Sequence, residues 1–184
     1  MADDVPIEIL KDITPFQQYT FDEINFARTK PAEYAELRLA AFKTNSTDNG
    51  SYQYLRNLTP VKALVFRNAL NQSASKYAAF LVEKNLLEHN ADGTPLIRAI
   101  REGYTGTSIG ENLAGASDNS YNATDNPQSA AIGFVTLLII DRGVDDFVHR
   151  LILLNSQYTT VGIGFGRNAT SAFINCTVQD FGNR

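Results

Sequence analysis

Ser108-Ile109-Gly110-Glu111-Asn112-Leu113-Ala114 is the stretch around which the rest of the chain is organised. It places a carboxylate beside a carboxamide, directly after a glycine, within a segment of loop-like composition that runs from Tyr104 to Asp125. Charged residues on loops serve binding or catalytic sites more often than cores. His89 and His149, the two histidines of the chain, lie on either side of this stretch. Two imidazoles and one carboxylate would make a divalent-metal site or a polar cavity if the fold brings them together.

The same residues also allow a purely structural interpretation. Both histidines would then be satisfied surface or core side chains, and Glu111 would cap a helix. Spacing along the chain does not separate the two interpretations, so both stay open at this point.

The composition predicts one globular domain and excludes several classes of protein. A chain of 184 residues is long enough to bury roughly 70% of its unfolded surface in one domain. Its composition, 43% hydrophobic and 20% charged, is typical of a globular protein. A net charge of -4 and a pI near 5.1 argue against a nucleic-acid partner held by phosphate contacts. The longest apolar run, Ala130 to Ile140, is far shorter than the ~20 residues of a membrane span. Cys176 is the only cysteine, so no intrachain disulfide and no all-cysteine metal site is expected.

Two observations on compartment point in different directions. Met1-Ala2-Asp3-Asp4 is acidic and lacks the apolar core of a signal peptide. Asn-X-Ser/Thr triplets are frequent, which hints at a glycosylated, secretory history. They begin at Asn45, Asn49, Asn57, Asn71, Asn122, Asn168 and Asn175. The residues alone leave the compartment open.

The first half of the chain predicts helices separated by polar segments. Residues 1–19 are expected to form an irregular leader. A capping-box pattern at Thr20 to Glu23 predicts a helix that continues past Pro31 to about Phe42. Lys43 to Leu58 is expected to be a polar loop, and Thr59-Pro60 is expected to begin the longest helix, from about Val61 to Leu87.

The second half predicts shorter helices and a terminal hairpin. Thr94-Pro95 and Asn126-Pro127 each indicate a helix start, and the second of these helices should be central because it is apolar nearly all round to Ile140. A further helical segment carries His149. Thr160 to Gly166 and Ser171 to Phe181 read as antiparallel strands. Glycines in the first of these strands are expected to ease packing rather than bind phosphate. Helices with a terminal hairpin predict an α+β fold, a sheet covered by helices.

Four stretches in order carry a resemblance to a known family. They are Asn25 to Leu37, His89 to Tyr104, Ile109 to Leu113, and Ile139 to Gly164, and Asn175 to Phe181 extends the last of them. Together they resemble the CAP superfamily, the SCP domains of cysteine-rich secretory proteins, antigen 5 and pathogenesis-related-1, in a microbial form without disulfides. The resemblance implies an α-β-α sandwich with a central antiparallel sheet. It places a single CAP/SCP domain at residues 20–184.

The family also implies a shallow cavity where two histidines and two acidic residues meet. His89, Glu111 and His149 match three of the four positions. The usual second glutamate is missing, and Asp141 is the expected substitute.

Three further residues bear on this cavity. Asn112, beside Glu111, is expected to line it. Asp145 and Asp146 are weaker candidates than Asp141 for the fourth position. Val148 stands where the family has a glycine, and its branched side chain is expected to narrow the cavity or tilt His149.

The resemblance implies a non-enzymatic protein rather than an enzyme, with no catalytic residue assigned. The cavity would bind a small apolar ligand of sterol or fatty-acid type, or a protein partner. His89 and His149 would hold Zn²⁺ or another divalent cation weakly, because two imidazoles leave the remaining coordination to water and carboxylates. The family and the glycosylation triplets favour an extracellular, secreted protein, although a cytoplasmic one is compatible with the absence of a signal peptide from this sequence.

Two alternatives remain. In the first, the fold is a scaffold for structure or interaction: Glu111 pairs with His149, and Arg98 or Arg150 bridges acidic residues. In the second, a hydrolase uses Glu111 as general base on a bound water. No G-x-S-x-G or H-E-x-x-H motif supports the hydrolase.

Overall fold

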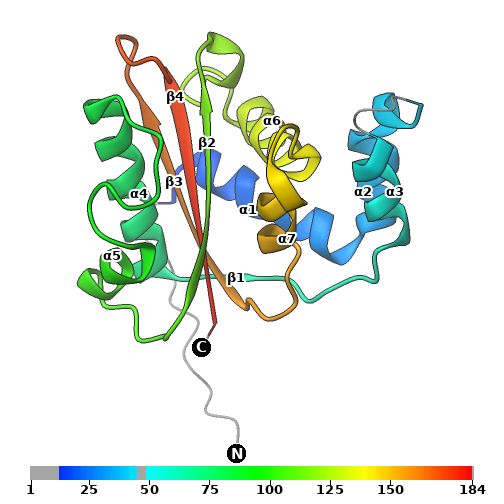
Figure 1. Cartoon of the computed structure of the whole chain (residues 1–184), viewed down its shortest axis with the longest axis horizontal. Coiled ribbons are helices and arrows are strands. Elements are labelled where there is room, and N and C mark those ends of the chain that lie inside the picture. The colour runs from blue at the N-terminus through cyan, green and yellow to red at the C-terminus, as the bar shows by residue number, and fades with distance from the viewer. Residues whose placement is uncertain (1–12, 45–48, 184) are drawn as a thin grey trace, which may run out of the picture.

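A four-stranded mixed sheet forms the centre of the chain in a computed structural model, which describes residues 13–44 and 49–183 (Figure 1). The strands are β1 (Val65–Phe66), β2 (Ile109–Ala116), β3 (Thr160–Arg167) and β4 (Asn175–Gly182), in the spatial order β1-β3-β4-β2. Strand β4 pairs antiparallel with both β2 and β3, and the short edge strand β1 pairs parallel with β3. The predicted α+β fold and its central antiparallel strands are confirmed.

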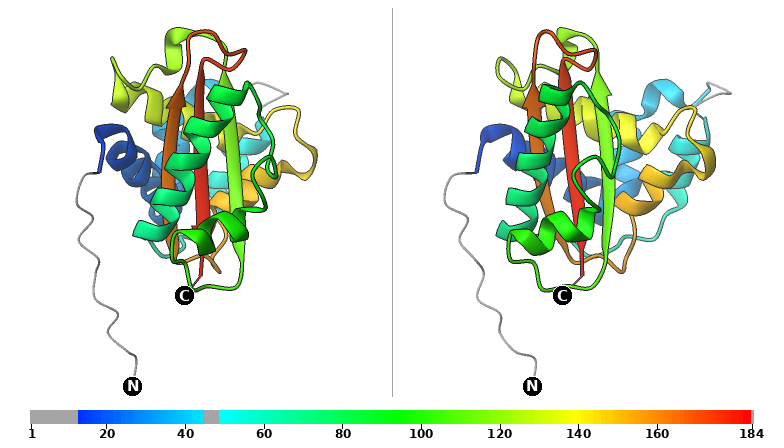
Figure 2. Two further views of the ribbon diagram at one scale, coloured as in Figure 1. Left: turned by 90° about the vertical axis from the view of Figure 1, so that its left-hand side faces the viewer. Right: turned by 60° about the vertical axis from the view of Figure 1, so that its left-hand side comes forward.

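Helices cover both faces of the sheet (Figure 2). One face carries α4 (Asn68–Lys84) and α5 (Pro95–Arg101); the other carries α1 (Pro15–Thr29), α6 (Pro127–Ile140) and α7 (Val148–Leu153), with α2 (Pro31–Arg38) and α3 (Asn49–Asn57) packed together farther out. Short 3₁₀ turns occupy Ala40–Phe42, Asn119–Tyr121 and Asp145–Phe147. Within the described ranges, no helix combines the length and apolarity needed to cross a membrane.

Helix α4 lies directly on the backbone of β3. A Cβ atom on Gly162 would stand 2.0 Å from the carbonyl carbon of Leu70, and one on Gly164 would stand 2.0 Å from the carbonyl oxygen of Ala74. No side chain fits between the two elements, so these glycines set the helix-to-sheet distance. The expectation that they serve packing is confirmed.

The first helix begins earlier than predicted. Thr14 caps α1: its hydroxyl accepts from the Gln17 amide (3.3 Å), and the Gln17 side chain accepts from the Thr14 amide (2.9 Å). The capping box predicted at Thr20 is wrong, because Thr20 lies inside α1 and is fully buried. Residues 15–19 are therefore helical, and residues 1–12 of the predicted leader lie outside the described residues.

Thr59-Pro60 does not begin a helix, and the helix predicted from Val61 to Leu87 is shorter. The chain before α4 is extended because its backbone bonds to α1: the Val61 amide donates to the Arg28 carbonyl (2.9 Å), and the Leu64 amide donates to the Asn25 side chain (2.7 Å). The stretch then forms β1. Tertiary hydrogen bonds override the local start signal here.

Two predicted loops contain regular structure. The segment from Lys43 to Leu58 includes α3, and the segment from Tyr104 to Asp125 includes β2. Most residues of β2 are buried irrespective of the face they occupy, so the strand shows no alternation of polar and apolar residues. The predicted starts of α5 and α6 are confirmed: the Thr94 and Asn126 side chains accept from the amides three residues ahead, at 3.3 and 3.2 Å.

Candidate functional site

Glu111 and Asn112 lie on edge strand β2 and point to opposite faces of the sheet, because successive side chains alternate along a strand. Glu111 faces the α4–α5 side, where it contacts His89 and Arg98. Asn112 faces the α6–α7 side, where its amide donates to the His149 carbonyl at 3.0 Å. His89 therefore contacts β2 through its imidazole, and His149 contacts it through its backbone carbonyl.

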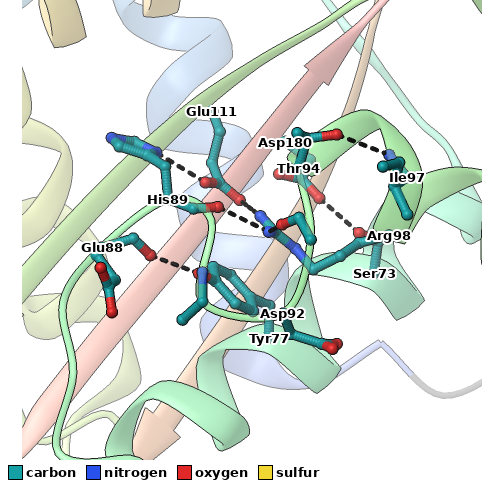
Figure 3. Close-up of polar contacts among 12 residues, drawn as sticks. Ser73, Tyr77, Glu88, His89, Asp92, Thr94, Ile97, Arg98, Glu111 and Asp180 are labelled. Atoms are coloured by element: carbon teal, nitrogen blue, oxygen red, sulfur yellow. Dashed lines mark hydrogen bonds and ion pairs between the residues drawn. The ribbon is translucent and has the colours of Figure 1, made fainter.

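On the α4–α5 side, Glu111 is held between an imidazole and a guanidinium (Figure 3). Its Oε1 lies 2.8 Å from His89 Nδ1, and its Oε2 forms an ion pair with Arg98. The Glu111 side chain is 1% exposed, the Arg98 side chain 4% and the His89 side chain 47%. Both carboxylate oxygens are engaged and shielded, so Glu111 is poorly placed to activate a water molecule as general base.

Arg98 joins this pair to the loop before α5. Its guanidinium donates to the carbonyls of His89 (2.8 Å) and Gly93 (2.5 Å) and lies 3.4 Å from the ring centroid of Tyr77. Burial raises the pKa of Tyr77, whose hydroxyl donates to the Glu88 carbonyl at 2.5 Å. One buried cation thus fixes the segment that carries His89.

Asp180 adds a second acid to this cluster. It stands directly opposite Glu111 in the β2–β4 register, is fully buried, and accepts from the Ser73 hydroxyl at 2.9 Å. Burial, reinforced by the neighbouring Glu111 carboxylate, raises the pKa of Asp180 well above its usual value. We call Ser73, Tyr77, Arg98, Glu111 and Asp180 the Arg98 cluster.

On the α6–α7 side, Asp141 holds His149. Asp141 ends α6 in the left-handed conformation (φ 56°), and its carboxylate accepts from the amides of His149 (2.9 Å) and Arg150 (3.2 Å) at the start of α7. Its other oxygen lies 2.7 Å from His149 Nδ1. Asp141 therefore ends α6 through its backbone conformation, and its carboxylate caps α7 and orients the His149 imidazole.

The Asp141–His149 pair lies at a cleft of about 900 Å³. Its other walls come from α2 and the turn after it, from α6, and from β2. Most of the lining is apolar: Leu37, Phe42, Leu113, Ile132, Leu137 and Ile140. We call this hollow the α2–α6 cleft.

The five predicted cavity residues lie on or beside strand β2 and at the junction of α6 and α7. Asp141 and His149 line the α2–α6 cleft. Glu111 belongs to the Arg98 cluster and contacts His89, and Asn112 follows Glu111 on β2 and contacts the His149 carbonyl. The pairing of Glu111 with His149 that the scaffold alternative expected is wrong, since Glu111 pairs with His89 and Arg98.

The residues around His149 also differ from expectation. Val148 has ordinary helical angles (φ -60°, ψ -37°), is 44% exposed and does not line the cleft, so it does not narrow it. Asp145 and Asp146 are exposed, and Asp141 alone of the three reaches His149. Among the described residues, the Arg150 side chain bridges no acid at hydrogen-bond distance, and it donates to the carbonyls of Ile139 and Ile140.

The donor set fits a metal only in part. Each imidazole has its Nδ1 bound by a carboxylate, the arrangement that orients histidine ligands and leaves Nε2 for a metal. Across the described residues, however, no group of three or more His, Cys, Asp or Glu side chains is arranged to hold an ion. A preformed site of three or more protein ligands is therefore not supported.

Asp180, Ser73 and Tyr77 were missed by the sequence analysis. The available signal was an acidic residue inside the otherwise uncharged run from Asn175 to Phe181. A charge in a buried strand requires a partner, but the sequence alone does not show that the partner strand is the one carrying Glu111.

Comparison with known proteins identifies the family. The model of the CAP family, described as the cysteine-rich secretory protein family, matches residues 50–181. No curated protein sequence matches the chain. Among solved structures, an extracellular protein containing an SCP domain from Bacillus anthracis str. Ames is similar with a TM-score of 0.58 and 17% identity. That match covers 95% of this chain but 45% of the Bacillus protein, so this chain spans under half of its length.

Two further structures share the fold. An outer surface protein from Borrelia burgdorferi matches with a TM-score of 0.53 and 19% identity, over 89% of this chain and 93% of its own. Venom allergen-like protein 4 from Schistosoma mansoni matches with a TM-score of 0.53 and 11% identity, over 93% and 90%. At these identities the likeness concerns the fold alone, while the family model covers most of the described sheet and both histidine–acid pairs. The chain belongs to the CAP family.

Proposed function

We propose that this CAP domain is a binding protein that holds a small apolar ligand of sterol or fatty-acid type in the α2–α6 cleft. The observation that carries the proposal is a cleft of about 900 Å³ whose lining is mainly apolar and includes the hydrogen-bonded pair Asp141 and His149. Ligand sites commonly combine an apolar lining of ~300–1,000 Å³ with a few placed polar groups. The polar pair would orient the ligand's polar end.

Two leucines of the cleft lining are exposed to solvent. Leu37 on α2 is 61% exposed and Leu137 on α6 is 39% exposed, and both line the cleft. Large apolar side chains exposed around a hollow mark a binding surface more often than scattered ones do. A ligand chain lying between them would remove both from water.

Fluorescence titration with a fluorescent fatty acid, cis-parinaric acid, and a fluorescent sterol, dehydroergosterol, would test the proposal. We expect saturable binding of at least one probe to the wild-type chain and binding at least about tenfold weaker in Leu137→Glu, because a buried charge costs more than about 1.4 kcal/mol. Ile100→Glu is the matched control: Ile100 is 54% exposed on α5, across the sheet from the cleft. Equal affinity of the two variants, or no saturable binding by the wild type, would exclude the cleft as the ligand site.

A second proposal concerns a divalent cation. Nε2 of His89 and Nε2 of His149 would hold it, and the carboxylates of Glu111 and Asp141 support this by binding the opposite ring nitrogens. Such an ion would add a positive charge beside the cleft. Isothermal titration with Zn²⁺ should give a weak binding heat that disappears in the His89→Ala/His149→Ala double variant; equal heats from the two proteins would reject the proposal.

A further inference from the structure

Asn112 and Gln179 form a buried amide pair across two strands. They are direct partners in the β2–β4 register and both are fully buried. Partners in register share a face of the sheet, so Gln179 projects with Asn112 toward α6 and α7, away from Asp180.

The orientation of the Asn112 amide is set by the backbone of α7. Its Nδ2 donates to the His149 carbonyl at 3.0 Å. Turning the amide over would put Oδ1 against that carbonyl, two acceptors facing each other. The Asn112 oxygen must therefore point away from α7 and find a donor elsewhere.

Three atoms of the pair still require partners. Asn112 Oδ1, Gln179 Oε1 and Gln179 Nε2 make no hydrogen bond to any described residue. A buried amide oxygen or nitrogen without a hydrogen bond destabilises the folded state, so such atoms are rare in folded proteins. A direct bond from Gln179 Nε2 to Asn112 Oδ1 would satisfy two of the atoms, but Gln179 Oε1 would still lack a donor.

We infer that one internal water molecule binds between Asn112 and Gln179. It donates one hydrogen to Asn112 Oδ1 and the other to Gln179 Oε1, and it accepts from Gln179 Nε2. Water provides two donors together with acceptor capacity, which matches the three atoms, and internal waters typically make about three such bonds.

This water has a structural consequence for the site. It fixes the Asn112 amide in the orientation that holds the His149 carbonyl, and so it couples β4 through β2 to α7. It is a feature of the sheet interior and does not depend on whether the cleft binds a ligand.

Water-selective NOE spectroscopy on the ¹⁵N-labelled wild-type chain tests the inference. We expect cross-peaks from the water signal to the side-chain amide protons of Gln179 and of Asn112. Thr177 lies two residues from Gln179 on the same face of β4. Its hydroxyl proton exchanges with solvent and is therefore a second possible source of cross-peaks at the water frequency. The cross-peaks should therefore persist in Thr177→Val, and their loss in that variant would overturn the assignment.

A crystal structure and one variant complete the test. In the wild type, electron density for one water should lie within hydrogen-bond distance of the three amide atoms. A direct contact between Gln179 Nε2 and Asn112 Oδ1 without such density would overturn the inference. Gln179→Met keeps the side-chain length but removes two of the three partners, so the Asn112 cross-peak should disappear, whereas Gln72→Met on the exposed side of α4 should leave it unchanged.

Discussion

Glu111 and Asp180 stand opposite each other on neighbouring strands, and only one of these two buried acids contacts a cation. Among the described residues, Arg98 forms an ion pair with Glu111, whereas Asp180 accepts from the Ser73 hydroxyl. A second ionised carboxylate at this depth, without a cation of its own, would be very costly. Burial and the neighbouring Glu111 therefore raise the pKa of Asp180 and favour its neutral form.

The first prediction is a pH dependence that comes from Asp180. Its folded pKa is raised, mainly by burial and then by Glu111, so the folded state binds a proton that the unfolded chain releases above its usual pKa of 3.8. The corresponding stability is fully present below pH 3.8 and is lost as pH rises toward the folded pKa, at up to about 1.4 kcal/mol per pH unit. Urea unfolding at a series of pH values from 4 upward measures this slope.

Asp180→Asn is the matched variant, because its amide imitates the neutral acid but cannot ionise. We expect its free energy of unfolding to fall less steeply with pH than that of the wild type. Parallel curves for the two proteins would mean that Asp180 does not carry the proton.

The second prediction concerns Arg98. Removing its side chain in Arg98→Ala leaves the Glu111 carboxylate buried without its counter-ion and releases the carbonyls of His89 and Gly93. Breaking one partner of a buried pair typically costs about 3–5 kcal/mol, and urea unfolding should show a loss of this size. Arg101→Ala is the control, because the Arg101–Asp92 pair is about half exposed and should change stability by less than ~1 kcal/mol.

The double variant Glu111→Gln/Arg98→Met separates an unpaired charge from lost packing. It removes both charges, so it should be more stable than Arg98→Ala alone. If it is no more stable, the cost in Arg98→Ala comes from lost contacts such as the stacking on Tyr77, and not from the unpaired charge of the buried Glu111 carboxylate.

The sequence predicted the elements whose signals are local. Thr94-Pro95 and Asn126-Pro127 start helices because a capping side chain and a first-turn proline act within four residues. Strand β2 was not predicted, because burial on both faces removes the alternation that marks a strand. The extended stretch before α4 depends on the backbone and side chains of α1, which no local pattern reveals.

The site was predictable to the extent that family motifs name its residues. Those motifs named both histidines, Glu111 and Asp141. They did not show that the Glu111 and Asn112 side chains point to opposite faces of β2, which follows from their adjacent positions on a strand that the sequence did not reveal. The structure also bears on one of the seven glycosylation triplets, the one at Asn175. The Asn175 side chain is fully buried and donates to the Asp118 carbonyl at 2.7 Å, so this triplet is not available to a glycan in the folded chain.

The third prediction concerns the contact between α4 and β3. Gly162→Ala places a methyl group 2.0 Å from the Leu70 backbone, which cannot move without displacing α4. We expect the free energy of unfolding to fall by about 3 kcal/mol or more, because the backbone of α4, and not a flexible side chain, must move. Overpacking a core typically costs about 1–3 kcal/mol of stability. Gly50→Ala on α3, where a new Cβ meets nothing within 4 Å, should be neutral or slightly stabilising. Similar unfolding midpoints for the two variants would contradict the direct packing of α4 on the sheet.

The last prediction concerns Asp141, which performs three tasks at the junction of α6 and α7. Asp141→Ala removes the acceptor for the His149 and Arg150 amides and places a side chain with no local hydrogen bond in the left-handed conformation. A lost cap and a strained φ together should cost about 2–3 kcal/mol in urea unfolding. Asp141→Asn should cost less than about 1 kcal/mol, because asparagine tolerates positive φ and still offers an oxygen to the amides.

Asp145→Ala is the control variant, because Asp145 is a second candidate for the acidic position that the family fills with glutamate. Asp145 is exposed and does not contact His149 among the described contacts, so its loss should leave both stability and the amide chemical shifts of His149 and Arg150 unchanged. Those shifts should move in Asp141→Ala, because the first turn of α7 loses its cap. A stability loss in Asp145→Ala equal to that in Asp141→Ala would show that the acidic turn acts as a whole, and that Asp141 is not the single residue that orients His149.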